Sequence, residues 1–145
     1  MDRRALLQSL PTIALVPAAV WAGAQPEHAW AAGTTSTVYE LRIYHANEGK
    51  LDDLLKRFRE HTMTLFEKHG MKNVAYWTPL DDPLKGRTLI YILAHPSREA
   101  ATNNWKAFVD DPEWQKVRDA SEVNGKLVEK VDSTFMALTD FSPVL

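Results

Sequence analysis

The stretch RTLIYILAH, residues 87–95, predicts a β-strand that is buried on both of its faces. Its β-branched, aromatic and aliphatic residues favour extended backbone. Successive side chains of a strand alternate between two faces, and here both sets are apolar: Leu89, Tyr91 and Leu93 on one face, Ile90, Ile92 and Ala94 on the other. A sheet with one face in water shows a cleaner alternation of apolar and polar residues. Both faces of this strand are therefore expected to be covered.

The segments on either side of this strand predict three more strands and three helices. Strands are expected at 38–46, 73–79 and 130–141, and helices at about 50–69, 97–108 and 112–123. Gly70 fits the end of the first helix, Ser97 is a suitable N-cap for the second, and Asp111 followed by Pro112 starts the third. The order β-α-β-β-α-α-β is that of a ferredoxin-like α+β fold, an antiparallel sheet with helices on one face.

The second face of this sheet predicts a partner. The fourth strand resembles 87–95 in being apolar on both faces, with Phe135 and Ala137 against Met136 and Leu138. The helices are too few to cover both faces, so a second copy of the sheet is the simplest cover for the other one. We therefore expect a homodimer whose two sheets face each other.

The composition is that of one globular domain, because 45% of the 145 residues are hydrophobic and 25% are charged. The formal net charge is -2, so there is no basic excess to follow a phosphate backbone, and nucleic acid is not an expected partner. The chain has no cysteine, which excludes disulfides, thiolate nucleophiles and cysteine metal sites.

Residues 1–31 are predicted to be a cleaved signal peptide. Two arginines precede an apolar run that is short for a membrane span, and small-x-small sites permit cleavage after Ala24 or Ala31. The stretch RRALL favours the twin-arginine export route, with a general secretory signal as the alternative. Residues 32–37 are expected to be a linker and 38–143 the folded domain. Export would place that domain in the periplasm or outside the cell, without a membrane anchor after cleavage.

The stretch FREHTMTLFEKHG, residues 58–70, raises the question of a two-histidine site. At about 100° per residue, His61 and His69 fall within the apolar arc of the expected helix, while Glu60 and Glu67 lie on the opposite side. Eight residues separate the histidines by about 12 Å along the helix axis, which is too far for two ligands of one metal ion. No metal site is therefore predicted.

The two histidines have different expected roles. His69 is expected to stabilise the helix C-terminus, where an imidazolium interacts favourably with the helix dipole. His61 is expected to face the sheet. It is either a half-buried histidine with a backbone or tyrosine partner, or a polar anchor and proton donor in a ligand pocket between helix and sheet.

Four other residues are candidates for ligand binding. Arg42 shares a strand face with Glu40, and if a partner sheet covers that face the two must pair; the alternative is an anion site at Arg42. Tyr76, Trp77 and Tyr91 either line a pocket or are plain core aromatics of their strands.

Several short stretches, in their order and spacing, resemble those of NIPSNAP domains: YELRIY (39–44), EGKL (48–51), FEKHG (66–70), VAYW (74–77) and DPEW (111–114). The resemblance covers residues 38–143. It implies a dimeric α/β barrel, a superfamily that also holds cofactor-independent antibiotic-biosynthesis monooxygenases and haem-degrading enzymes. The predicted signal peptide departs from typical members and indicates an exported bacterial branch.

The resemblance implies little about chemistry, and three hypotheses stay open. The first is a homodimer that binds a small apolar or aromatic molecule, with His61 as its polar anchor. The second is an enzyme that uses no cofactor and acts on an aromatic or quinone-like substrate, with His61 as acid or base. The third is haem binding, with His61 or His45 as axial ligand; apart from it, no cofactor is predicted.

Overall fold

The computed structural model describes residues 37–143. Its elements, in chain order, are β1 (Val38–Ala46), α1 (Leu51–Arg57), the π-helical turn η1 (Phe58–Thr62), α2 (Met63–Lys68), β2 (Lys72–Trp77), β3 (Thr88–His95), α3 (Arg98–Asp110), α4 (Pro112–Ser121) and β4 (Val128–Met136). The predicted signal peptide and nearly all of the predicted linker lie outside the described residues. No helix within 37–143 is both long and apolar enough to cross a membrane.

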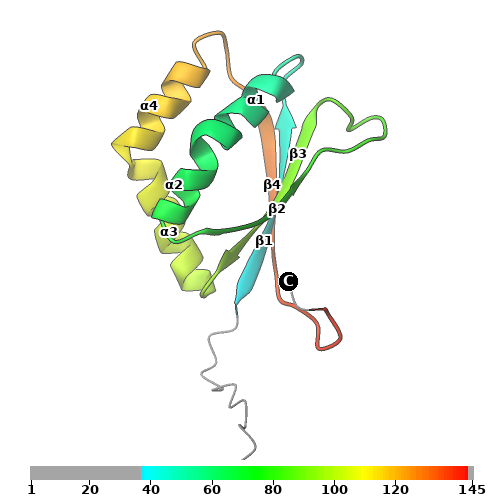
Figure 1. Ribbon diagram of the computed structural model, residues 1–145, viewed down its shortest axis with the longest axis vertical. Coiled ribbons are helices and arrows are strands. Elements are labelled where there is room, and N and C mark those ends of the chain that lie inside the picture. Colours follow the sequence, from blue (N-terminus) through cyan, green and yellow to red (C-terminus); the bar gives the residue numbers. More distant parts are fainter. Residues whose placement is uncertain (1–36, 144–145) are drawn as a thin grey trace, which may run out of the picture. The chain divides into compact units, whose positions relative to one another are not determined.

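The four strands form one antiparallel sheet in the order β2-β3-β1-β4, and the helices lie along one of its faces (Figure 1). This confirms the predicted ferredoxin-like α+β fold. Arg42 of β1 is opposite Tyr91 of β3 and Ser133 of β4, so these three side chains share the helix-covered face. β4 ends at Met136, earlier than predicted, because Tyr39 is its last partner on β1.

Hydrogen bonds and backbone geometry confirm the predicted starts of the second and third helices and the end of the first, whereas α3 ends at Asp110 and α4 at Ser121 instead of near 108 and 123. Ser97 Oγ accepts from the Ala100 N–H at 3.0 Å, and Asp111 Oδ1 accepts from the Glu113 N–H at 2.8 Å. Gly70 follows α2 with φ of +74°, a left-handed conformation that glycine adopts without steric cost. These boundaries fix the short connections that place α3 and α4 beside α1 and α2.

The first predicted helix is interrupted by one π-helical turn. The Met63 N–H donates to Phe58 O, five residues back, and Thr62 Oγ1 donates to Arg57 O at 3.3 Å. A π turn holds more residues than an α turn, so the residues that follow it are rotated relative to a regular α-helix. Thr62, the last residue of the turn, is on the buried side, with 1% of its surface exposed.

The core lies between the helices and the covered face of the sheet. Tyr91 of β3 is fully buried, and its ring centroid lies 5.2 Å from those of Phe58 and Tyr76. The ring of Phe66, on α2, lies 6.0 Å from that of Tyr91 and 5.3 Å from that of Trp105 on α3. Aromatic rings thus fill the layer between sheet and helices.

The other face of the sheet, here called the open face, is also apolar. Its side chains are half-buried or exposed: Leu41, Ile43, Ala75, Trp77, Ile90, Ile92 and Met136. Both faces of β3 are therefore apolar, as the sequence indicated, but the helices cover only one of them.

Candidate functional site

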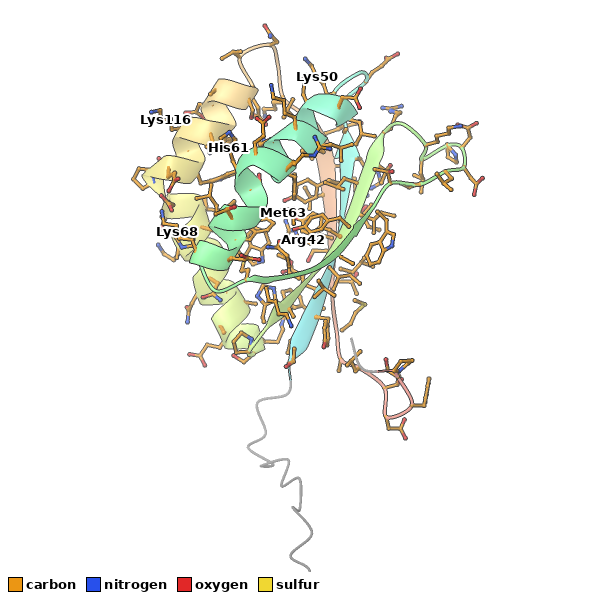
Figure 2. All side chains as sticks on the ribbon, in the orientation of Figure 1. Arg42, Lys50, His61, Met63, Lys68 and Lys116 are labelled. Carbon is orange, nitrogen blue, oxygen red and sulfur yellow. The ribbon has the colours of Figure 1, made fainter. Side chains whose placement is uncertain are left out.

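A groove of about 610 Å³ lies between α1–η1 and α4, and we call it the α1–α4 groove. Each side contributes residues at positions i, i+3, i+4, i+7 and i+8, which form one face of a helix. The lining comprises Asp53, Lys56, Arg57, Glu60 and His61 on one side, Glu113, Lys116, Val117, Ala120 and Ser121 on the other, and then Val123 and Asn124. Figure 2 labels His61 and Lys116 on the two helical segments that border it.

His61 faces this groove rather than the sheet. Its side chain is exposed and belongs to the groove lining, so the prediction that it faces the sheet is wrong. At about 100° per residue His61 lies at the edge of the apolar arc, and the π turn, which holds more residues per turn, rotates it further from that arc. A role for His61 as polar anchor stays a prediction, and the location of that ligand moves to the α1–α4 groove.

Arg57 is the most buried side chain of the groove lining, with 6% of its surface exposed. Its Nη1 donates to Ser121 Oγ at 3.2 Å and to Glu122 Oε1 at 3.3 Å, and its guanidinium lies 5.1 Å from the Trp114 ring centroid. Its Nε has no hydrogen-bond partner among residues 37–143. Burial lowers the pKa of Arg57, and the carboxylate of Glu122 opposes that effect. The groove therefore holds a cation with unused donor capacity.

A second polar cluster is buried under the helices around Glu40, of which 1% is exposed. Its Oε1 accepts from Arg42 Nη1 and Ser133 Oγ, both at 2.7 Å, and its Oε2 accepts from Trp105 Nε1 at 2.7 Å and His95 Nε2 at 3.0 Å. Burial opposes ionisation of Glu40, but the four donors outweigh it and lower the pKa to about 2. Glu40 is an ionised carboxylate whose acceptor sites are occupied.

The expected pairing of Glu40 with Arg42 is confirmed, but the face is the helix-covered one and not the face toward a partner sheet. Arg42 also stacks on the Trp105 ring, 4.1 Å from its centroid. Its Nη1 is bonded to Glu40 and its Nη2 lies 3.4 Å from Tyr44 Oη, while its Nε, like that of Arg57, is buried without a partner among residues 37–143. An anion site at Arg42 stays a prediction that this geometry does not favour.

A family model described as NIPSNAP matches residues 39–143. The chain belongs to the NIPSNAP family. An uncharacterised NIPSNAP-like domain protein from Burkholderia xenovorans superimposes with a TM-score of 0.65 at 16% identity, over 77% of this chain and 92% of that one. A NIPSNAP family protein from Agrobacterium tumefaciens gives a TM-score of 0.65 at 24% identity, over 75% of this chain and 99% of that one.

A monooxygenase from Streptomyces coelicolor, solved in complex with nanaomycin D, is more distant. Its TM-score is 0.52 at 16% identity, over 77% of this chain and 93% of that one. Such a likeness shows that the NIPSNAP domain and the monooxygenase share a fold. Among curated proteins, nothing matches the chain.

The aromatic candidates do not gather at one site in this NIPSNAP domain. Tyr76 and Tyr91 stack in the core with an interplanar angle of 14°, and burial raises the pKa of both phenols. Trp77 points to the open face and 49% of it is exposed. The two tyrosines are therefore separated by the sheet from Trp77, and none of the three lines the α1–α4 groove.

Three other histidines of the NIPSNAP domain each donate a hydrogen bond to a carboxylate: His45 to Asp132 at 2.9 Å, His69 to Asp111 at 2.7 Å and His95 to Glu40 at 3.0 Å. His69 therefore binds the N-cap residue of α4, a tie between two helices that sequence reasoning did not anticipate. Within 37–143, no group of three or more His, Asp or Glu side chains is placed to hold a metal ion.

Sequence reasoning also missed Arg57 and Lys116 as site residues. The signal that could have found them is the matching spacing of polar and small residues on two helical segments, at 53–61 and 113–121. That spacing becomes informative only when the two faces are known to lie opposite each other, which the NIPSNAP fold supplies.

Proposed function

We propose that this NIPSNAP-family protein is a homodimer that binds a small organic molecule in the α1–α4 groove. The groove carries the proposal, because its volume of about 610 Å³ lies within the range of small-molecule sites. Its lining combines apolar surface at Val117 and Ala120 with a few polar groups, among them Arg57, His61 and Ser121. This combination can both hold and orient a ligand.

The sequence placed a bound ligand or a substrate in a pocket between helix and sheet, next to His61, whereas His61 faces the groove. The rings of Phe58, Tyr76 and Tyr91 occupy the space that such a substrate would fill. Nanaomycin D is a ligand of the Streptomyces monooxygenase, and a shared fold alone is no reason to expect this chain to bind it.

The open face supports the homodimer. In addition to the apolar residues of its strands, large apolar side chains are exposed in the β2–β3 loop, at Leu80 and Leu84, and after β4, at Leu138 and Phe141. Exposed apolar surface of this kind is typical of protein interfaces. A second copy of the same sheet, related by a two-fold axis, provides a self-complementary cover.

We further propose that the protein belongs to an exported bacterial branch of the family and works in the periplasm or outside the cell. The arginine pair, the apolar run and the small-x-small sites of residues 1–31 support this. N-terminal sequencing of the protein from a periplasmic fraction tests it. A mature chain that begins after Ala24 or Ala31 is the expected result, and an uncut chain in the cytoplasm would contradict it.

Two-dimensional NMR of the mature protein, titrated with a fragment library, tests the binding function. A binding fragment is expected to shift the amide signals of His61 and Val117. Ala120→Trp should fill the groove and remove binding. Ala107→Trp is the matched control, because Ala107 is exposed on α3 and is not part of the groove lining. Fragments that bind the Ala120→Trp variant unchanged would overturn the proposal.

A further inference from the structure

We infer that the α1–α4 groove selects a small carboxylate with an apolar body, an inference that rests on the proposed binding function. It follows from three observations on the groove lining: which acidic residues are already paired, which basic residues are not, and what the buried guanidinium of Arg57 still lacks.

Two of the three acidic residues of the lining have a lysine partner outside the groove, although Lys68 is shared between Glu113 and Asp111. Asp53 Oδ2 lies 3.9 Å from Lys50 Nζ, and Glu113 Oε2 accepts from Lys68 Nζ at 2.8 Å. Lys50 and Lys68 do not line the groove, and Figure 2 shows both at the far ends of the α1–α2 segment. Glu60 is thus the one acidic residue of the lining without an ion pair in the part of the chain that the structure describes.

The basic residues of the lining are less committed. Lys56 and Lys116 form no ion pair with another residue of the 37–143 segment, although both face the groove. Arg57 shares its charge with Glu122 at 3.3 Å. The available charge of the groove is therefore positive, which favours an anionic ligand.

Arg57 specifies the kind of anion. Its bonds to Ser121 and Glu122, at 3.2 and 3.3 Å, are longer than the about 2.7–2.9 Å of strong charge-assisted bonds. Its Nη2 has no hydrogen-bond partner within the described residues and, unlike its Nε, is not fully enclosed by protein atoms. A carboxylate matches the planar fork of a guanidinium. Beside it, Val117 and Ala120 provide apolar surface for the body of the ligand.

Benzoate and benzamide are a suitable pair of probes, because they differ in charge and little in shape. Calorimetric titration of the mature protein is expected to show benzoate binding at least about tenfold more tightly than benzamide, since a charge-assisted bond adds that much. Equal binding of the two probes would overturn the carboxylate inference and leave the proposed binding function intact. If neither probe binds while other fragments shift His61 and Val117, the inference also fails and the function survives.

Two variants locate the interaction. Arg57→Lys keeps the charge and removes the fork, so benzoate affinity should fall about tenfold; near-ultraviolet circular dichroism checks that its fold is intact. Lys116→Glu alters an exposed residue that makes no hydrogen bond or ion pair with another residue of 37–143, and it should weaken benzoate binding while sparing benzamide. Lys85→Glu, on the exposed β2–β3 loop outside the groove, is its charge-matched control. Equal losses in Lys116→Glu and Lys85→Glu would place benzoate elsewhere and overturn the inference.

Discussion

Trp105 Nε1 donates to Glu40 Oε2 at 2.7 Å, which ties helix α3 to a carboxylate that is buried in the central part of the sheet. The same carboxylate also binds Arg42, His95 and Ser133, from three different strands. Glu40 is therefore the point at which β1, β3, β4 and α3 are joined by hydrogen bonds. Its removal would leave several buried donors without an acceptor.

Glu40→Gln is expected to destabilise the fold by about 3 kcal/mol, because it leaves the Arg42 guanidinium buried without its counter-charge. Urea denaturation at a fixed protomer concentration measures this. Glu129→Gln is the matched control, since Glu129 forms only an exposed ion pair with Arg87 at 3.6 Å, and its effect should stay within about 0.5 kcal/mol. Similar losses in the two variants would contradict the central role of Glu40.

The stability of the protein should fall in acid through the same residue. The pKa of Glu40 is lowered from 4.5 to about 2 in the fold. Ionised Glu40 therefore stabilises the fold above pH 4.5, and this contribution, about 3 kcal/mol, is lost as the pH falls from 4.5 towards 2. Urea midpoints across this interval should fall less steeply for Glu40→Gln than for wild type. The urea midpoint of Glu40→Gln should still depend on pH to some extent, because hydrogen bonds from Lys68 and His69 also lower the pKa of Asp111.

The sequence predicted the element order because its signals are local. The β-branched, aromatic and aliphatic residues of 87–95 mark a strand, and Ser97, Asp111 and Gly70 mark helix ends with their own side chains or backbone. The orientation of His61 was not predictable in the same way. The π turn at 58–62 changes the angle between successive side chains around the helix axis, and no periodic pattern in the sequence indicates such a turn. The groove was missed because it depends on which faces of α1 and α4 meet, a tertiary relationship.

Two glycines with positive φ should differ in their tolerance of alanine. Gly70 and Gly49 have φ of +74° and +69°, so both substitutions are strained, by about 1 kcal/mol. A Cβ at Gly70 would lie 3.1 Å from Asn104 Nδ2, whereas nothing lies within 4 Å of one at Gly49. Asn104 Nδ2 also donates to Gly70 O at 3.2 Å, so it cannot retreat without losing that bond. Thermal unfolding should show Gly70→Ala as the more destabilised variant. Equal losses of stability in the two variants would mean that the Asn104 side chain moves aside without cost.

The last prediction concerns the open face of the sheet. Ile92 lies in β3, one of the two central strands, opposite Leu41 of β1 and Ala75 of β2. If two sheets face each other, Ile92→Asp places a carboxylate from each protomer in the apolar contact. The free energy of dimerisation then becomes less favourable by about 3 kcal/mol or more, so dimer affinity falls over a hundredfold. Sedimentation velocity at micromolar protein should show a wild-type dimer and an Ile92→Asp monomer. Val109→Asp, exposed on α3, is the matched control and should remain dimeric. A monomeric wild type, or an Ile92→Asp variant that still dimerises, would exclude the sheet-to-sheet homodimer.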